Sequence, residues 1–323
     1  MIDMEFFDSP DSDWDKRILK SELGRYHQTT LQAKHLSAFR NYKPIFVLFR
    51  KAKNIVGQQL LFLRPRGNSF IKRSLGKLTK QFYFWNNSIL IFDESYQHEI
   101  LKSFASFIEN KKFIGLDTPI AKYHLDLPYS KVGTVIFDIK DTFEDTISDR
   151  DPTSTQKYVA LAANEGIPTK KGVISKKIET DDEIKVYYKM LIEHRKNLGI
   201  KTFSSFNELQ DRIKTLNKYG HGGAMLAYHD NIPISGIIYF NYNGWINNFA
   251  IANTLYSLEN KLSSLDYLRC NLIAIGVKTS AKYFDVGGIT LNPKTDKEAR
   301  IRHSQTKWGG KVIEYYRYTN LWF

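Results

Sequence analysis

Apolar residues recur at three- and four-residue spacing in some segments and form continuous or alternating runs in others. The first pattern is typical of amphipathic helices and the second of strands. In the first half of the chain, helices are predicted at 14–22, 31–39 and 98–109, and strands at 44–49, 55–63, 82–92 and 132–139. This half is therefore expected to combine helices with a sheet.

The second half begins after a polar stretch at 149–152 that contains Pro152. Helices are predicted at 154–164, 181–198, 206–218, 265–280 and 299–307, and strands at 222–228, 232–240, 245–252, 283–286 and 312–318. The helix at 181–198 has the clearest signals. Thr180 is placed to cap it, acidic residues fill its first turn and basic residues its last, so both ends suit the helix dipole.

The length of 323 residues exceeds what one hydrophobic core usually organises, which is about 250–300 residues. The order helix, hairpin, helix, strand is similar in the two halves. We therefore expect an α/β protein with mixed sheets and two domains, 1–150 and 151–323, with the last strand pairing back onto the first domain.

Composition removes several classes of protein. No apolar run approaches the roughly 18 residues of a membrane span, and the acidic N-terminus differs from a signal peptide, which predicts a cytoplasmic protein. The single cysteine, Cys270, rules out an intrachain disulfide framework and zinc sites built from cysteine pairs. The eight histidines include no His-Glu-x-x-His pairing, so no metal is expected.

Basic residues are concentrated in one window of the first half. The formal net charge is +13, and no acidic residue occurs between Glu22 and Asp93. Thirteen basic residues lie in that window: Arg25, Lys34, Arg40, Lys43, Arg50, Lys51, Lys53, Arg64, Arg66, Lys72, Arg73, Lys77 and Lys80. Cations without counter-ions repel one another, so the window favours an anionic partner, the alternative being a solvated basic surface.

Two motifs near the C-terminus have the residue types of a reaction site. The predicted strand at 283–286 ends in Asp285-Val286-Gly287-Gly288, which places a carboxylate and bare backbone N–H groups at a strand end; the alternative is a turn that needs glycine. Lys307-Trp308-Gly309-Gly310 follows a basic helix, and no acidic residue occurs between Glu298 and Glu314. Lys307 is therefore expected to be an uncompensated cation able to meet an oxyanion.

Several segments together resemble the Fem family of peptidoglycan-bridge aminoacyltransferases. They are His27-Gln28 followed by Lys34, Val56-Gly57 in a predicted hairpin, Leu191-Ile192-Glu193-His194-Arg195-Lys196-Asn197-Leu198-Gly199, Ile234-Ser235-Gly236, Ala252-Asn253 before a helix, Phe284-Asp285-Val286-Gly287-Gly288, and Lys307-Trp308-Gly309-Gly310. Their order and spacing agree with the family over nearly the whole chain. The short helix at 206–218 leaves no room for the coiled-coil arm of some members, so the likeness is to the armless form.

The resemblance implies two tandem GNAT-like (GCN5-related N-acyltransferase) domains, the first binding the acceptor and the second the acyl donor. Members of the family transfer an aminoacyl group from aminoacyl-tRNA to a free amine of a nucleotide- or lipid-linked precursor. The expected partners are therefore aminoacyl-tRNA and a cell-wall or surface-polysaccharide precursor, with peripheral contact at the inner membrane face. No cofactor is expected beyond the co-substrate, aminoacyl-tRNA or acyl-CoA.

The resemblance also assigns roles to individual residues. Lys34 and Arg195 match positions that contact the anionic precursor, and Lys307 matches a lysine at the acyl-transfer centre. Asn253, Tyr256 and Arg73 complete the expected substrate-binding set. Asp285 is the expected base by its place in the motif, with Tyr256, His303 and a substrate phosphate as alternatives. Taken singly, Lys34 is also consistent with a solvated surface lysine, and Arg195 and Lys307 with charges at a helix end.

Two other functions remain open. In an acyl-CoA N-acyltransferase, a loop opening a helix cradles the pyrophosphate; Arg73-Ser74-Leu75-Gly76-Lys77-Leu78 is the nearest match, but Leu78 stands where a small residue is needed. A non-catalytic protein that binds RNA or an anionic glycan would use Phe82, Tyr83, Phe84 and Trp85 as a stacking face. Such an aromatic run is more typical of a buried strand.

Overall fold

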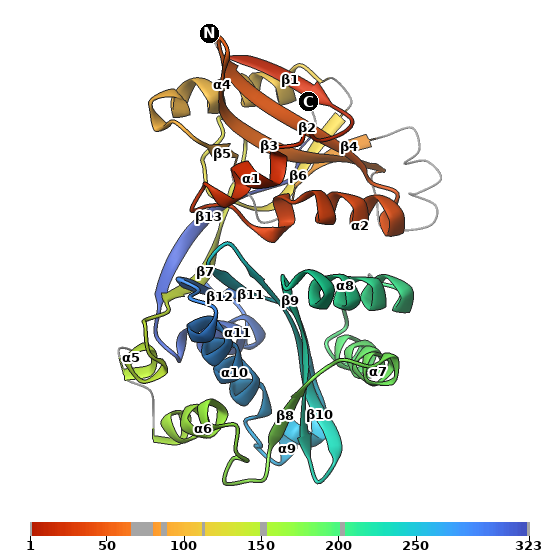
Figure 1. Ribbon diagram of the computed structural model, residues 1–323, viewed down its shortest axis with the longest axis vertical. Helices are drawn as coiled ribbons and strands as arrows, with labels where there is room; N and C mark the ends of the chain where they lie inside the picture. Colours follow the sequence, from red (N-terminus) through yellow and green to blue (C-terminus); the bar gives the residue numbers. More distant parts are fainter. Residues whose placement is uncertain are drawn as a thin grey trace. The chain divides into compact units, whose positions relative to one another are not determined.

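The computed structural model describes residues 2–65, 80–84, 89–111, 114–148, 154–200 and 204–321. The chain divides into two units (Figure 1). Unit 1 is Met1–Gly133 with Glu314–Phe323, and unit 2 is Thr134–Ile313. The domain boundary predicted from sequence, between residues 150 and 151, falls in 149–153, outside the described residues. The two functional domains 1–150 and 151–323 stay a prediction.

Unit 1 is built on a mixed sheet in the order β1-β2-β3-β4-β6-β13. Its strands are β1 (Asp3–Phe7), β2 (Lys43–Lys51), β3 (Asn54–Pro65), β4 (Lys80–Tyr83), β5 (Leu90–Ile91), β6 (Ile114–Ala121) and the end of β13 (Lys311–Leu321). Its helices are α1 (Trp14–Leu19), α2 (Thr30–Arg40) and α4 (Gln97–Glu109), with short 3₁₀ helices at Tyr26–Gln28 and Glu94–Tyr96. β4 and β6 run parallel, while β1, β2, β3 and β4 pair antiparallel in turn.

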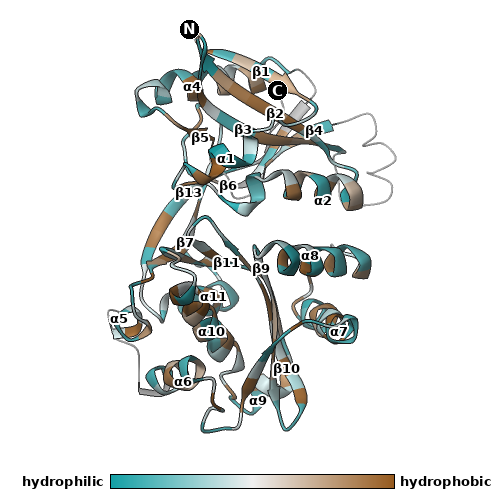
Figure 2. Cartoon of the chain, viewed as in Figure 1, coloured by the Kyte–Doolittle hydropathy of each residue, from teal (hydrophilic) through white to brown (hydrophobic). Residues whose placement is uncertain are grey.

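The core of unit 1 lies between the sheet and α4. Hydrophobic residues run along β2 and β3 (Figure 2), and α4 buries Ile100, Phe104 and Ile108. The aromatic run is part of this core, because Phe82, Tyr83 and Phe84 expose 5% or less of their surface. All three residues are buried, as predicted, and offer no stacking face, but only Phe82 and Tyr83 belong to β4, which ends before Phe84. Trp85 lies outside the described residues.

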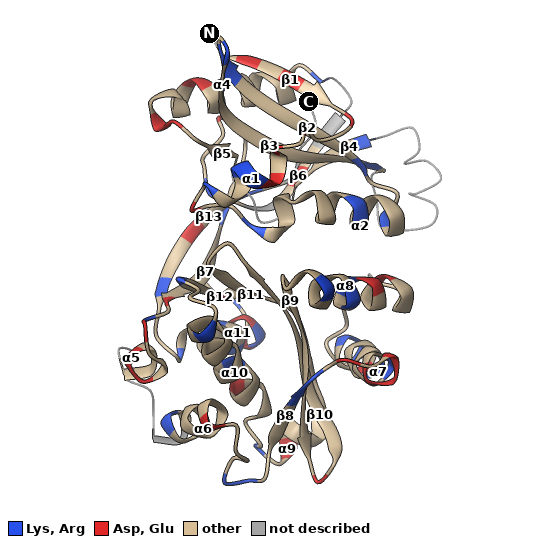
Figure 3. Ribbon diagram, viewed as in Figure 1, with Lys and Arg blue, Asp and Glu red and all other residues tan. Residues whose placement is uncertain are grey.

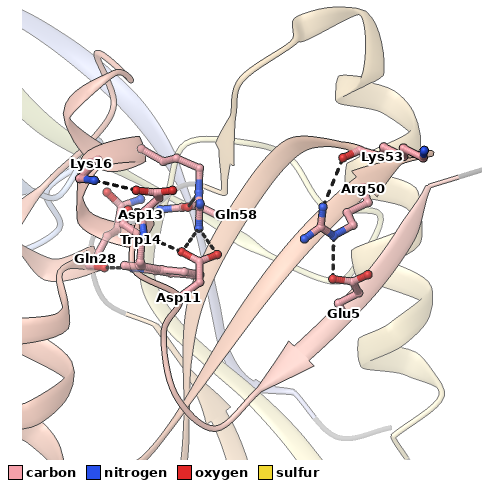
Figure 4. A network of polar contacts seen from close by, with 10 residues as sticks. Glu5, Asp11, Asp13, Trp14, Lys16, Gln28, Arg50, Lys53 and Gln58 are labelled. Atoms are coloured by element: carbon pink, nitrogen blue, oxygen red, sulfur yellow. Dashed lines mark hydrogen bonds and ion pairs between the residues drawn. The ribbon is translucent and has the colours of Figure 1, made fainter.

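A polar network fixes α1 against the strands of unit 1 (Figure 4). The indole Nε1 of Trp14 donates to the carbonyl of Gln28 at 2.9 Å, and the amide of Gln58 donates to the carbonyl of Trp14 at 3.3 Å. Arg17 binds both Asp11 and the side chain of Gln58. Buried polar groups are thus paired as α1 closes over β3.

The basic window of the first half is partly neutralised, so the expectation that all its cations lack counter-ions is wrong. Acidic residues from outside the window form ion pairs with four of them. Figure 3 marks the acidic and basic positions along the ribbon. The pairs are Lys43 with Asp8 (2.9 Å), Arg50 with Glu5 (2.7 Å, Figure 4), Lys51 with Glu99 (3.5 Å) and Arg64 with Asp117. The fold supplies Glu5 and Asp8 by pairing β1 with β2, Asp117 by pairing β6 with β4, and Glu99 from α4. Local sequence reveals none of these partners.

Unit 2 has its own sheet, in the order β7-β12-β11-β10-β9-β8. Its strands are β7 (Ser130–Asp138), β8 (Ile174–Lys177), β9 (Gly222–His229), β10 (Ile232–Tyr242), β11 (Trp245–Asn253) and β12 (Tyr283–Ile289). Its helices are α5 (Phe143–Ser148), α6 (Ser154–Glu165), α7 (Asp181–Asn197), α8 (Phe206–Tyr219), α9 (Leu255–Glu259), α10 (Ser264–Lys278) and α11 (Asp296–Thr306). α7 and α8 cover one face, and α10 and α6 the other (Figure 1).

Close packing of α7 on the sheet depends on Gly236 in β10. A Cβ at this position would lie 2.4 Å from the ring of Tyr187, so only glycine lets the ring lie flat on the strand. Tyr187 is buried, and its hydroxyl donates to the carbonyl of Ala250 in β11 at 3.0 Å. Tyr187 thereby fixes α7 over both strands.

Most predicted helices and strands are confirmed, with shifts of a few residues at their ends. The single strand predicted at 82–92 is wrong, because β4 ends at Tyr83 and β5 covers only Leu90–Ile91. The prediction lacks the strands β1, β6 and β8 and the helices α5 and α9. In the described residues, no helix combines the length and apolar character needed to cross a bilayer.

The predicted cap of α7 is confirmed. Thr180 Oγ1 accepts from the backbone N–H of Glu183, and the Glu183 carboxylate accepts from the N–H of Thr180. We expect Thr180→Ala to lower the free energy of unfolding by about 1 kcal/mol, because one N–H then lacks its acceptor. Thr180→Ser keeps the hydroxyl and is the matched control. Equal urea midpoints for the two variants would contradict the capping role.

Candidate active site

The parallel strands β11 and β12 pair at their starts and then separate. The paired residues run from Trp245↔Tyr283 to Asn247↔Asp285, whereas the strands continue to Asn253 and Ile289. We call this opening the β11–β12 fork. The side chain of Asn248 bridges its narrow end by donating to the carbonyl of Val286 at 2.9 Å. Ligands of open α/β sheets bind at the carboxyl ends of strands, so the fork is the expected position of a binding site.

A bulge in β11 lies just beyond the narrow end of the fork. Ile238 of β10 faces Ala250, but Tyr239 faces Asn248, so Phe249 is the extra residue of the bulge. Bulges bend a strand and increase its twist, and they often lie beside functional sites. Phe249 packs against the ring of Phe240 and beneath the guanidinium of Arg212 at 4.7 Å. The bulge therefore has a defined packing that holds the strand in its bent course.

Buried hydroxyl groups join the end of β11 to the first turn of α10. Ser235 Oγ donates to Asn253 Oδ1 at 2.6 Å, and Ser264 Oγ forms hydrogen bonds with the hydroxyls of both Ser235 and Ser257. All three serines are buried. These bonds fix the amide oxygen of Asn253, one of the residues predicted to bind substrate. The amide NH₂ of Asn253 is consequently the end left to donate to a ligand.

The first turn of α10 also holds the predicted catalytic lysine. Lys307 caps the C-terminal end of α11, and its Nζ lies 2.5 Å from Asp266 Oδ2. Trp308 is buried, and its indole Nε1 donates to the other carboxylate oxygen of Asp266 at 3.4 Å. The prediction that Lys307 is uncompensated is therefore wrong. Its counter-ion comes from a helix 41 residues earlier in the sequence, which the run of basic residues around Lys307 does not disclose.

A second cation lies behind this ion pair. Arg269, one turn along α10 from Asp266, is buried and donates to the backbone carbonyl of Ser304 at 3.0 Å and to Gln305 Oε1 at 3.1 Å. Within the described part of the chain its Nε has no hydrogen-bond partner, and its guanidinium lies 3.9 Å from Asp266. Burial lowers the pKa of Arg269 from its usual value, yet an arginine stays protonated. Two cations therefore share one carboxylate, and the cluster has a net positive charge.

Asp285 lies on β12 at the narrow end of the fork. Its Oδ1 accepts from the hydroxyl of Thr134 at 2.6 Å and from the backbone N–H of Gly287 at 3.0 Å. Gly287 adopts φ of 121°, which favours glycine, and a Cβ there would lie 3.6 Å from Gln305 Nε2. Gln305 thus lies between β12 and Arg269. Two donors therefore hold Oδ1 of the Asp285 carboxylate in place.

The other predicted site residues that the structure describes belong to other elements, α2, α7 and α9. Arg195 is half-buried in the last turn of α7, and Tyr256 of α9 is 41% exposed with its hydroxyl 3.1 Å from His229 Nδ1. Lys34 is an exposed residue of α2 in unit 1, at the edge of a cavity of about 340 Å³ that Ala33 and Phe46 also line. Arg73 and the loop at 73–78 lie outside the described residues. The roles of all these residues stay predictions.

Sequence reasoning missed Asp266, Arg269 and the serine cluster. Asp266 and Arg269 are polar residues three apart in a predicted helix that is otherwise largely apolar, which is a weak signal for a shared polar face. Nothing in the local sequence of Ser235, Ser257 and Ser264 indicates that their hydroxyls meet. Their juxtaposition depends on the pairing of β10 with β11 and the packing of α10 beneath them.

Comparisons with solved structures identify the fold. The structure of FemX superposes with a TM-score of 0.71 at 10% identity, covering 97% of this chain and 96% of that one. L-PGS from Bacillus licheniformis gives 0.55 at 13% identity over 97% and 92%, and a tandem GNAT protein of clavulanic acid biosynthesis gives 0.52 at 10% identity over 98% and 97%. No protein-family model and no curated protein sequence matches the chain. The predicted α/β fold of two tandem GNAT-like acyltransferase domains is confirmed.

Removing the charge of Asp266 is expected to destabilise the protein. Asp266→Asn keeps the size of the side chain but leaves Lys307 and the buried Arg269 without a carboxylate. We expect the free energy of unfolding to fall by about 2 kcal/mol, the scale of a lost hydrogen bond to a charged group. Chemical denaturation measures this change. Asp182→Asn removes an exposed ion pair with Lys185 and is the matched control, with little change expected. Equal shifts for both variants would contradict the account.

Proposed function

We propose that the chain is an N-acyltransferase of the Fem type. It transfers an aminoacyl group from aminoacyl-tRNA to a free amine of a nucleotide- or lipid-linked cell-wall or surface-polysaccharide precursor. One observation carries the proposal: a FemX-like fold over 97% of the chain whose predicted catalytic lysine, Lys307, belongs to a net cationic cluster beside the β11–β12 fork. The reaction belongs in the cytoplasm, where charged tRNA is made, with the precursor reached at the inner membrane face.

The charges of the cluster suit the transition state of acyl transfer. An amine that attacks an ester carbonyl generates a tetrahedral oxyanion, which fixed positive charge stabilises. Asp266 holds Lys307 Nζ in one place, and Arg269 offsets the negative charge of Asp266. A lysine that is already held needs little rearrangement as negative charge develops on the acyl oxygen. We assign Lys307 to this oxyanion and the Asn253 amide to the acyl donor.

The acceptor is assigned to cationic residues outside the cluster. Lys34 stands at a cavity of unit 1 whose lining includes apolar residues, an arrangement that suits an anionic group attached to a less polar body. Arg195 supplies a second cation from the end of α7, in unit 2. The phosphates of such a precursor are complementary in charge to each of these residues.

An acyl-CoA donor is the alternative with structural support, because a tandem GNAT protein shares the fold at a TM-score of 0.52. With this donor, the chain would transfer an acyl group from acyl-CoA to an amino sugar, and the same cationic cluster would stabilise the oxyanion. The proposal of a non-catalytic RNA- or glycan-binding protein has lost its main support, since Phe82, Tyr83 and Phe84 are buried.

Replacing Lys307 tests the oxyanion role. With aminoacyl-tRNA and a UDP-linked precursor that carries an amine, Lys307→Ala is expected to slow amide formation at least about tenfold, because loss of one oxyanion donor typically costs about 10²–10³ in kcat. Lys307→Arg keeps the charge and is expected to recover part of the rate. Lys278→Ala, at the exposed end of α10, is the control. Unchanged turnover in Lys307→Ala would remove this lysine from the mechanism.

Thermal stability in the presence of each donor separates the two acyltransferase functions. A ligand that binds only the folded protein raises its melting temperature. We expect aminoacyl-tRNA to raise it more than deacylated tRNA does, and acetyl-CoA to leave it unchanged. A rise with acetyl-CoA but not with aminoacyl-tRNA would instead favour the acyl-CoA-dependent enzyme.

A further inference from the structure

His194 contacts the end of β11 from the last turn of α7. Its imidazole is half-buried, and Nδ1 lies 3.1 Å from the backbone carbonyl oxygen of Asn253. The sequence pattern explains His194 only as one of the basic residues that suit a helix C-terminus. A helix-end charge does not need this contact, since the Asn253 carbonyl belongs to the sheet and not to α7.

The carbonyl of Asn253 points into the β11–β12 fork. The next backbone N–H, that of Thr254, donates to the carbonyl of Ile234 in β10 at 3.0 Å. In a trans peptide the C=O and the following N–H point in opposite directions. Asn253 O therefore points away from β10, toward the edge of β11 that β12 has left. The imidazole of His194 is consequently at the open edge of the fork, next to Asn253 of β11. The side-chain amide of Asn253 is connected through Ser235 to Ser264 in the first turn of α10. Asp266 in that turn binds Lys307.

This contact fixes which nitrogen of His194 carries the proton. A carbonyl oxygen only accepts hydrogen bonds, so Nδ1 must be the donor. In the neutral imidazole Nε2 then has a free lone pair. Nε2 forms no hydrogen bond within the described part of the chain. Burial holds the pKa of His194 below its usual value, so the ring is neutral at pH 7.

The charged groups around His194 act in the same direction. Among the described residues, only the neighbouring Arg195 acts electrostatically on the imidazole, and it also lowers the pKa. β11 has no titratable side chain, and those of β10 are tyrosines. The titratable residues of α8, which packs against α7, are Glu208, Asp211, Arg212, Lys214, Lys218 and Tyr219. From α11, Lys297 reaches the C-terminal end of α7, where it donates to the carbonyl of Leu198 at 3.2 Å.

We infer that His194 is the general base of the proposed acyl transfer, an assignment that rests on the proposed function. As the acceptor amine attacks the acyl carbonyl, the nitrogen lone pair forms the new C–N bond and its proton passes to His194 Nε2. The C–O ester bond then breaks, and its electron pair goes to the ribose oxygen of the tRNA. The imidazolium returns the proton to that oxygen. The products are an amide, a free hydroxyl and neutral His194.

The test measures kcat and KM against pH with alanyl-tRNA and a UDP-linked muramoyl peptide that carries a lysine. His194→Asn can still donate to the Asn253 carbonyl but lacks a basic nitrogen. We expect kcat to fall about 100-fold with KM unchanged, and the decline of the rate at acid pH to disappear, because general bases typically contribute 10²–10⁴-fold. Added imidazole is expected to recover part of the rate in His194→Ala. His98→Asn, an exposed histidine of α4, is the control.

Other results would overturn the role of His194 or contradict the proposed function. An unchanged pH profile in His194→Asn, with an active wild-type protein, would overturn the role of His194 and leave the proposed function standing. Loss of the acid limb in Asp285→Asn alone would assign the base to Asp285 instead. If the wild-type protein turned over neither alanyl-tRNA nor acetyl-CoA, this result would contradict the proposed function and, with it, the role of His194 as base. Independently of activity, ¹⁵N NMR showing the proton of neutral His194 on Nε2 would also overturn the inference.

Discussion

Backbone groups that lose their strand partner must find another, and this constraint shapes the whole candidate site. β11 and β12 pair over three residues and then separate, so carbonyl and N–H groups face the opening from both strands. Side chains meet two of these groups: Asn248 donates to Val286, and His194 donates to Asn253. Backbone groups at such an opening that have no partner within the sheet can bind a ligand. A fork between parallel strands therefore costs free energy through its unpaired backbone groups, and the same groups form a binding surface.

Charged groups around α10 are likewise paired by side chains from other elements. Its first turn places Asp266 where a helix favours negative charge, and that carboxylate then holds Lys307 and Trp308 from the end of α11. Arg269 adds a second cation, whose Nε donates no hydrogen bond among the residues that the structure describes. A cluster with one positive charge in excess is stabilised when negative charge appears beside it, which is the condition that acyl transfer creates. Structure and proposed chemistry thus depend on one carboxylate.

Local patterns were sufficient for the longer helices, but not for the short helices α5 and α9 or for the site. The spacing of apolar residues, the cap at Thr180 and the buried aromatic run at Phe82 are properties of short segments, and the structure confirms them. The counter-ion of Lys307 and the parting of β11 from β12 depend on contacts between distant segments. Short edge strands such as β1 and β8 also escape prediction, since their exposed side chains follow no apolar alternation. His194 looked like a helix-end charge because its acceptor lies 59 residues away.

The most direct measurement is a crystal structure with a non-hydrolysable 3′-amide analogue of aminoacyl-adenosine. The account predicts that the analogue lies in the β11–β12 fork, with its acyl oxygen within hydrogen-bonding distance of Lys307 Nζ and its acyl group beside the Asn253 amide. An analogue bound away from the fork, or one whose acyl oxygen faces solvent while Lys307 keeps only Asp266, would contradict it.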